Sequence, residues 1–355
     1  MKGSVLKKFL CTCLVTAAAF AATTISASAC TTIYVGGDLV EEGTPFVART
    51  EDYGSDYNKL WFISESGKWK QGDHYVGCPE YGPFEWDFTH DSYRFTYFTN
   101  DIYYDGICPE CGEKADHYSY TEFGTNEKGV SVSATETLYG NEKVTEADPY
   151  RDAEWAEANK SERIGIEETD IPTIILAEAS SAREGVKLLL DIYENYGCVA
   201  ASGVFVCDKD EVWYVENCSG TQYVAIKLND NMIFLEPNMA VIGRVDLDDE
   251  NVIASKDLIA VAKKAGTFVG DEAKNIIDFR ASYARISEKM DQRMIDGLNY
   301  LNATYKYDSD ALVADNTKFT ISNLDASDKL VALYTNIKAD RKLDKDDVFG
   351  YYKLS

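Results

Sequence analysis

The chain has 355 residues, a formal net charge of −25 and 45% hydrophobic residues, with 24 Tyr and 15 Phe among them. This apolar content excludes general disorder, and the length suits one large domain or a domain with a sizeable insertion. So acidic a chain is not expected to bind nucleic acid or an anionic membrane surface.

Residues 1–29 have the layout of a secretory signal peptide. Three lysines precede a largely apolar run at 9–25, and residues 27–29 (Ala-Ser-Ala) have the small-x-small form that signal peptidase cuts after. We therefore predict export, to the cell surface or beyond, and no membrane segment after cleavage. Removing three lysines and no acid takes the net charge from −25 to −28. The remaining domain would span 30–355.

The first half of this domain predicts strands and a long elaboration. Strand patterns at 31–36 and 46–50 are separated by a Gly-Thr-Pro turn. Residues 61–122 are aromatic, rich in Gly and contain all three His, so we interpret them as a loop-rich insertion. A strand is predicted at 129–136, followed by an irregular acidic segment at 141–170.

The second half alternates helices and strands. A capping-box pattern at Ser181 and a stop signal at Gly197 bound a predicted helix. We then expect a hairpin, two strands and two helices, at 199–207 with 211–218, 222–228, 232–235, 252–264 and 275–303. This order favours a mixed, layered α and β domain over a regular βαβ repeat.

Cys30 would be the first residue of the cleaved chain, and three interpretations compete for it. It could be a structural cysteine. It could be the acylated cysteine of a surface lipoprotein, although Ala27 stands where a lipobox has an apolar residue such as Leu. It could also be an N-terminal nucleophile, because a thiol and a free α-amine on one residue supply both nucleophile and base.

The nucleophile hypothesis requires charged neighbours. Arg49, on the strand expected to pair with 31–36, could reach the sulfur and favour the thiolate, and Asp52 could hold the amine. A Cys–His dyad is the alternative, with His74, His90 or His117 as its base. A Ser–His–Asp hydrolase is disfavoured because no G-x-S-x-G motif is present.

Several motifs resemble one family in the same order along the chain. Cys30-Thr31-Thr32-Ile33 and the run from Arg49 to Gly54 (RTEDYG) resemble the start of the C69-type dipeptidases, which are N-terminal nucleophile (Ntn) hydrolases. Further matches are NEKG at 126–129 with SATET at 133–137, SAREGV at 181–186, EVWYVE at 211–216 with Ser219-Gly220, and Asn238. The resemblance implies an α+β fold, a four-layer αββα sandwich, and cysteine dipeptidase activity without a cofactor.

The resemblance also implies roles for individual residues. Cys30 would be the nucleophile, with its own α-amine as base, Arg49 would tune the thiolate, and Asp52 would position the amine. Asn238 would donate to the oxyanion, with a second donor expected near Thr135-Glu136. Related choloylglycine hydrolases and penicillin V acylases carry a later Arg, for which Arg293 is preferred over Arg280 and Arg285. Glu51 or Glu136 could bind the ammonium of a small peptide substrate.

A structural zinc site is a further possibility. His74, Cys78, Cys108, Cys111 and His117 could supply its ligands, but outside the cell a disulfide or free thiols are favoured for these cysteines. Metal is not needed for the Cys30 mechanism.

The end of the chain raises a question of length. Family members are usually longer, so either the C-terminal part of the family fold is missing or this is a shortened form. The acidic stretch 340–347 is interpreted as the start of a solvated helix. A homo-oligomer is possible. The alternatives kept open are a choloylglycine- or penicillin V acylase-like amidase, and a non-enzymatic lipoprotein anchored at Cys30.

Overall fold

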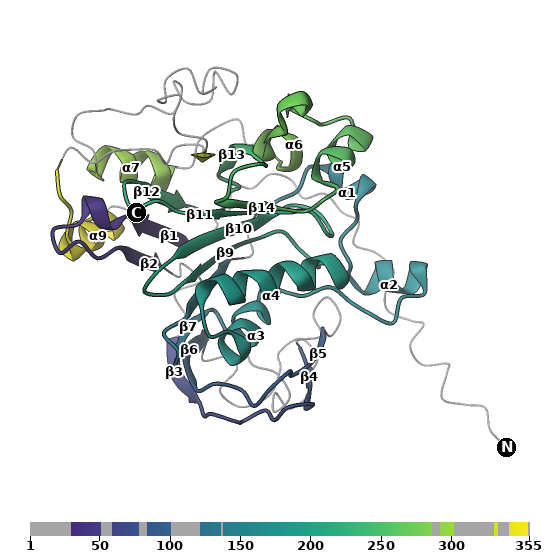
Figure 1. The fold of residues 1–355 in the computed structure, drawn as a ribbon, viewed down its shortest axis with the longest axis horizontal. Helices are drawn as coiled ribbons and strands as arrows, with labels where there is room; N and C mark the ends of the chain where they lie inside the picture. The colour runs from purple at the N-terminus through teal and green to yellow at the C-terminus, as the bar shows by residue number, and fades with distance from the viewer. Residues whose placement is uncertain are drawn as a thin grey trace, which may run out of the picture.

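The structure of the protein, a computed structural model, describes residues 30–50, 59–77, 84–100, 121–135, 138–285, 292–301, 330–332 and 341–353. Within these ranges β-sheets occupy the middle of the molecule and helices cover them on both sides (Figure 1). This is the layer order of an αββα sandwich, so the predicted α+β fold is confirmed.

The largest sheet has eight antiparallel strands in the order β14-β11-β10-β9-β8-β7-β6-β3. The predicted hairpin is confirmed as β9 and β10. Because β3 and β6 belong to this sheet, interpreting 61–122 as a loop-rich insertion was wrong for these strands. The bounds are β3 Lys59–Ser64, β6 Phe95–Asn100, β7 Phe123–Asn126, β8 Ser131–Thr135, β9 Ser202–Cys207, β10 Val212–Asn217, β11 Tyr223–Lys227 and β14 Val252–Ala254.

A second sheet carries the N-terminal residues of the described chain. Its order is β12 (Ile233–Glu236), β1 (Thr31–Val35) and β2 (Phe46–Thr50), with β1 central and antiparallel to both neighbours. The predicted pairing of β1 with β2 is therefore confirmed. Two smaller sheets are formed by β15 (Gly270–Asp271), β16 (Ile276–Asp278), β13 (Ile242–Asp246) and β17 (Leu330–Ala332), and by β4 (His74–Val76) with β5 (Glu85–Asp87).

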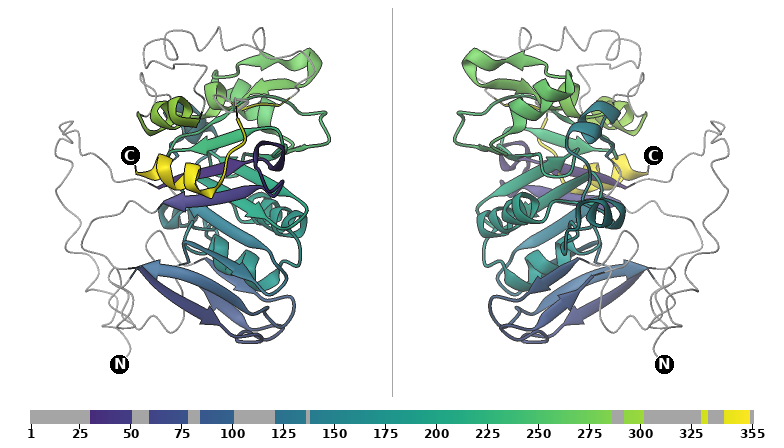
Figure 2. Two further views of the ribbon diagram at one scale, coloured as in Figure 1. Left: turned by 90° about the vertical axis from the view of Figure 1, so that its left-hand side faces the viewer. Right: turned by 90° about the vertical axis from the view of Figure 1, so that its right-hand side faces the viewer.

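Helices cover the outer faces. Helices α3 (Ile171–Glu178) and α4 (Ala182–Asn195) lie on the large sheet, and α7 (Gln292–Leu301) and α9 (Lys345–Tyr352) lie beside the β12-β1-β2 sheet (Figures 1 and 2). The central strands of the large sheet, β8 to β11, are buried on both faces. On β9, Val204 and Val206 pack toward α4, while Phe205 packs against Phe234 of the second sheet. Within the described ranges the other helices are α1 (Glu142–Ala147), α2 (Ala153–Asn159), α5 (Leu258–Ala265) and α6 (Phe279–Tyr283), and Gly37–Leu39 and Glu272–Lys274 form 3₁₀ turns.

Two predicted helices, 252–264 and 275–303, begin later than expected. Residues 252–254 form β14 and not the first turn of a helix, and 276–278 form β16 ahead of α6. The segment 141–170 contains α1 and α2 and is not irregular throughout. Helix α3 was missed because all eight of its residues are buried, so it has no polar face to mark its period.

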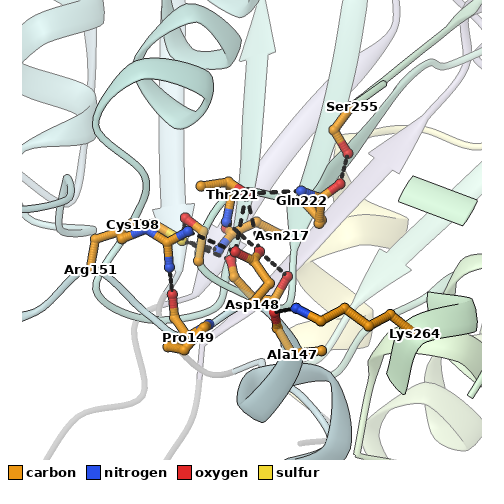
Figure 3. Close-up of polar contacts among 12 residues, drawn as sticks. Ala147, Asp148, Pro149, Arg151, Cys198, Asn217, Thr221, Gln222, Ser255 and Lys264 are labelled. Carbon is orange, nitrogen blue, oxygen red and sulfur yellow. Dashed lines mark hydrogen bonds and ion pairs between the residues drawn. The ribbon is translucent and has the colours of Figure 1, made fainter. Parts of the chain in front are cut away.

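Two sequence motifs, NEKG at 126–129 and Ser219-Gly220, are held by buried hydrogen bonds. Asn126 donates to the carbonyls of Leu176 and Ala179 at 2.9 and 2.8 Å, which ties the β7–β8 turn to the end of α3. Buried Asp148 accepts from the Thr221 N–H at 2.7 Å and from the Ser219 hydroxyl at 2.9 Å, and thereby holds the β10–β11 turn (Figure 3). Both motifs therefore fix connections between the sheet and its helices.

No helix in the described part of the chain is both long and apolar enough to cross a membrane.

Candidate active site

Cys30 lies directly before β1, and its sulfur faces a guanidinium. Arg49 of β2 donates from Nη2 to Cys30 Sγ at 3.4 Å. The pairing of Thr32 with Arg49 brings the arginine to this end of β1, as the strand pattern predicted. A cation at this distance stabilises the thiolate over the thiol, and the thiolate is the nucleophilic form of cysteine.

Arg49 is held by contacts with the large sheet. Its Nη1 donates to the Glu122 carbonyl at 3.0 Å, to Ser133 Oγ at 3.1 Å and to the Ala134 carbonyl. These acceptors lie on or beside β7 and β8, so the guanidinium bridges the two sheets. Its orientation toward Cys30 is therefore set by backbone that belongs to the core.

We expect Arg49→Met to shift the pH midpoint of Cys30 alkylation upward by about one pH unit. The reason is the loss of the charge beside the sulfur. The measurement is the rate of iodoacetamide labelling against pH, with folding checked by circular dichroism. Arg94→Met, which removes an exposed arginine paired with Glu65 at 3.4 Å, is the control. If folded Arg49→Met shows the same pH midpoint as the unaltered protein, Arg49 does not stabilise the Cys30 thiolate.

Arg293 and Asn238 meet on the other side of Cys30. Arg293, in the first turn of α7, donates from Nη1 to the Cys30 carbonyl at 3.0 Å, to Thr31 Oγ1 at 3.0 Å and to Asn238 Oδ1 at 3.1 Å. Its Nη2 donates to the Pro237 carbonyl at 3.0 Å. The amide of Asn238 thus presents its acceptor end to Arg293, and its Nδ2 donor end faces away from that guanidinium.

The last described helix also reaches this region. Tyr351 of α9 is buried and donates its hydroxyl to the Arg293 carbonyl at 3.1 Å. Tyr352 donates to the Ala48 carbonyl at 2.8 Å and lies 3.3 Å from the Thr31 carbonyl. Figure 2 shows α9, in yellow, alongside strands β1 and β2. The stretch 340–347, predicted to start a solvated helix, thus leads into a helix with a buried face.

Other described thiols are poor nucleophiles. Burial raises the pKa of Cys207 to about 11, and it raises the pKa values of Cys198 and Cys218 further. All three lie outside any disulfide. A buried thiol with a raised pKa stays protonated at neutral pH, whereas Cys30 has a guanidinium beside its sulfur.

The zinc hypothesis has one ligand inside the described residues. His74 is exposed and its Nδ1 lies 2.8 Å from Asp87 Oδ1, and no group of three His, Cys, Asp or Glu side chains in the described ranges could hold a metal. Cys78, Cys108, Cys111 and His117 lie outside these ranges, as do Asp52, Glu51 and Glu136 of the predicted site. Of the alternative bases, His90 contacts the carbonyls of Asp91 and Glu178 at 2.7 and 3.0 Å.

Sequence reasoning missed a pair of buried carboxyls behind the site. Glu216 of β10 and Glu236 of β12 are both fully buried. Glu216 accepts from the N–H groups of Val241 and Ile242 at 2.6 and 3.1 Å and so holds the chain just after Asn238. The available signal was an acid that follows a run of apolar residues within a strand.

The free energy of unfolding should reach its maximum at about pH 5. Burial raises the pKa of Glu216 to about 7 and that of Glu236 to about 8, from an ordinary value of 4.5. Between pH 4.5 and about pH 8 these two carboxyls bind more protons in the folded protein than in the unfolded chain. The free energy of unfolding therefore falls as pH rises through this range. Hydrogen bonding from Arg183 lowers the pKa of Glu211 to about 2, so its contribution is lost as pH falls below 4.5.

Urea unfolding at pH 5 and pH 8 is the measurement. In the double variant Glu216→Gln/Glu236→Gln, the free energy of unfolding should decrease less between pH 5 and pH 8 than in the unaltered protein. In Glu211→Gln the decrease should remain. Greater stability at pH 8 than at pH 5 in the unaltered protein would refute the assignment.

The model of peptidase family C69 matches residues 29–312. This chain belongs to peptidase family C69. The match begins one residue before Cys30 and includes Arg49, Asn238 and Arg293. The family predicted from the motifs is therefore confirmed.

Curated relatives bear dipeptidase names. The chain is 32% identical over 304 residues to a "Probable dipeptidase B" of Streptococcus pyogenes serotype M6 (strain ATCC BAA-946 / MGAS10394), covering 84% of this chain and 55% of the relative. It is 32% identical over 262 residues to a "Probable dipeptidase" of Salmonella dublin, covering 72% and 53%. The chain thus spans about half the length of the curated relatives it matches.

Solved structures are more distant. Penicillin V acylase from Agrobacterium tumefaciens aligns at 15% identity with a TM-score of 0.34, over 59% of this chain and 49% of the acylase. A mutant of conjugated bile acid hydrolase from Clostridium perfringens aligns at 13% identity with a TM-score of 0.29, over 68% of this chain and 59% of the hydrolase. Such low scores add nothing to the assignment of family C69.

Proposed function

We propose that the protein is an exported cysteine dipeptidase that uses Cys30 as an N-terminal nucleophile. The observation that carries the proposal is the 3.4 Å contact between Arg49 Nη2 and Cys30 Sγ, at the residue where signal cleavage is predicted. Membership of family C69 and the dipeptidase names of the relatives support the substrate class.

In the proposed reaction the α-amine of cleaved Cys30 accepts the thiol proton, and Sγ attacks the carbonyl carbon of the peptide bond. The carbonyl oxygen becomes an oxyanion that Asn238 Nδ2 would stabilise. Collapse of this intermediate breaks the C–N bond, and the amine leaves with the proton from the α-ammonium. Water then hydrolyses the thioester to release the second amino acid and restore the thiol.

The contacts described around Cys30 support two of these steps. Arg49 favours the thiolate. Arg293 binds the Cys30 carbonyl and Asn238 Oδ1 with one nitrogen, and so couples the nucleophile to the oxyanion donor. Asp52 would hold the ammonium, and Glu51 or Glu136 would receive the amino end of the substrate.

The test begins with protein exported from a host that cleaves the signal. Intact mass should correspond to a chain starting at an unmodified Cys30, and the chain should hydrolyse members of a dipeptide panel into free amino acids. Diacylglycerol on Cys30 with a blocked amine would reject the proposal in favour of a lipoprotein. Cleavage of penicillin V or bile-salt conjugates with no dipeptide cleavage would replace it with an acylase.

A further inference from the structure

Glu236 lies in the same row of side chains as the residues around the nucleophile. Thr32, in the middle strand of the three-stranded sheet, pairs with Arg49 on one side and with Glu236 on the other. Residues paired across neighbouring strands share a face, so Arg49, Thr32 and Glu236 point the same way, toward the large sheet. Cys30, two residues before Thr32, belongs to this face by the alternation of the strand.

The expected oxyanion pocket has two arms, Asn238 and Thr135. Each carboxylate oxygen of Glu236 contacts one of them. Oε1 accepts from the backbone N–H of Asn238 at 3.0 Å. Oε2 lies 3.2 Å from the hydroxyl of Thr135, the last residue of β8, where the second oxyanion donor is expected. The same hydroxyl lies 3.2 Å from the Gly203 carbonyl, so its proton serves one acceptor at a time.

The contact with Asn238 spans a backbone turn that needs support. Asn238 has a φ of 53°, in the left-handed region, which Asn tolerates better than most residues but which is still uncommon. The bond from its N–H back to Glu236 closes the turn around Pro237. Arg293 holds the same turn from the outer side, through the Pro237 carbonyl and Asn238 Oδ1.

We propose that Glu236 is a positioning residue: a buried carboxyl that ties Asn238 and Thr135 into one rigid oxyanion pocket behind Cys30. The inference rests on the proposed hydrolase function. Burying a carboxyl is unfavourable, and a leucine of similar size would stabilise an ordinary core better. Packing therefore does not explain a glutamate at this position. We infer that its role is to orient the oxyanion donor.

The charges around Glu236 are compatible with this role at neutral pH. Burial raises its pKa to about 8, the charge of Glu216 adds to this effect, and Arg49 opposes it. Three further titratable groups lie near these carboxyls: Tyr214 donates to Glu216 at 3.0 Å, and Cys218 and Arg280 interact electrostatically with Glu216. A protonated carboxyl keeps acceptor capacity, so the bond from Asn238 is available in both states.

The test is a double-mutant cycle of Glu236→Leu with Asn238→Ala, read out on dipeptide hydrolysis. Glu236→Leu should lower kcat about 10- to 100-fold, while iodoacetamide labelling of Cys30, which forms no oxyanion, stays within about threefold. Because Glu236 acts partly through Asn238, the loss in the double variant should be clearly smaller than the product of the two single losses. Glu236→Gln is the matched control: its amide oxygen accepts from Asn238, its NH₂ donates to Thr135, and kcat should stay within about threefold.

Additive losses in the cycle, or equal losses of labelling and hydrolysis in Glu236→Leu, would overturn the inference. Should Glu236→Leu fail to fold, Thr135→Val with Asn238→Ala asks the same question from the other arm, and additivity there also overturns it. Failure of the proposed function is seen separately, because an inactive unaltered protein or an active Cys30→Ala variant rejects both.

Discussion

Replacing Cys30 by alanine is expected to lower dipeptide hydrolysis by at least about 10⁴-fold, because removal of a nucleophile leaves only the binding and oxyanion contributions. Cys30→Ser should retain at most a trace, since a hydroxyl is a far weaker nucleophile at neutral pH. The measurement is release of free amino acids from the best dipeptide, with thermal unfolding to show that each variant is folded.

The control is Cys207→Ser. Cys207 is paired with Ser131 at the start of β8, whereas the pocket lies at the Thr135 end, and burial raises its pKa to about 11. Its removal should change kcat by less than about twofold. Undiminished hydrolysis by folded Cys30→Ala would mean that another group is the nucleophile.

A second variant separates the thiol from the amine. A chain processed so that one extra residue precedes Cys30 keeps the sulfur beside Arg49 but has no free α-amine on Cys30. Its thiol should react with iodoacetamide at nearly the rate of the unaltered protein, and it should hydrolyse no dipeptide. Normal turnover by this chain would show that the base is elsewhere.

Replacing Arg293 by methionine is expected to lower kcat about 100-fold, with a smaller change in KM. One guanidinium contacts the Cys30 carbonyl, Thr31 Oγ1, Asn238 Oδ1 and the Pro237 carbonyl, all at 3.0 to 3.1 Å. Its loss removes the contacts through which Arg293 holds the Asn238 amide and the carbonyls of Cys30 and Pro237. Lysine cannot replace the planar fork, so Arg293→Lys should also be strongly impaired.

The matched control is Arg285→Met, because Arg285 was an alternative candidate from the sequence. Arg285 stacks on the Tyr139 ring with its guanidinium carbon 4.3 Å from the centroid, so its variant should keep kcat within about twofold. Tyr351→Phe, which removes the hydroxyl bond to the Arg293 carbonyl, should give an intermediate loss. Steady-state kinetics on one dipeptide rank the three variants. Wild-type kcat in folded Arg293→Met would exclude the coupling between Arg293 and the oxyanion donor.

Local sequence signals account for much of the fold. The β1–β2 pairing, the β9–β10 hairpin and helix α4 were predictable, because their turns, caps and periodicity are written within short windows. Helix α3 and strands β3 and β6 were not predicted. A fully buried helix has no polar face, and strands at the far edge of a sheet are defined by partners distant in sequence.

Cys30, Arg49 and Asn238 were predictable from the sequence, since Cys30 follows a cleavage signal and the other two stand in motifs of family C69. Arg49 also followed from strand pairing, because a hairpin brings its two strands into register. Only the tertiary structure placed Arg293 and Asn238 together and showed that α9 contacts the same site. It alone identified Glu236, whose partners Asn238 and Thr135 lie two and 101 residues away. The contact between Glu236 and Thr135 depends on how the two sheets pack, and no local pattern encodes that packing.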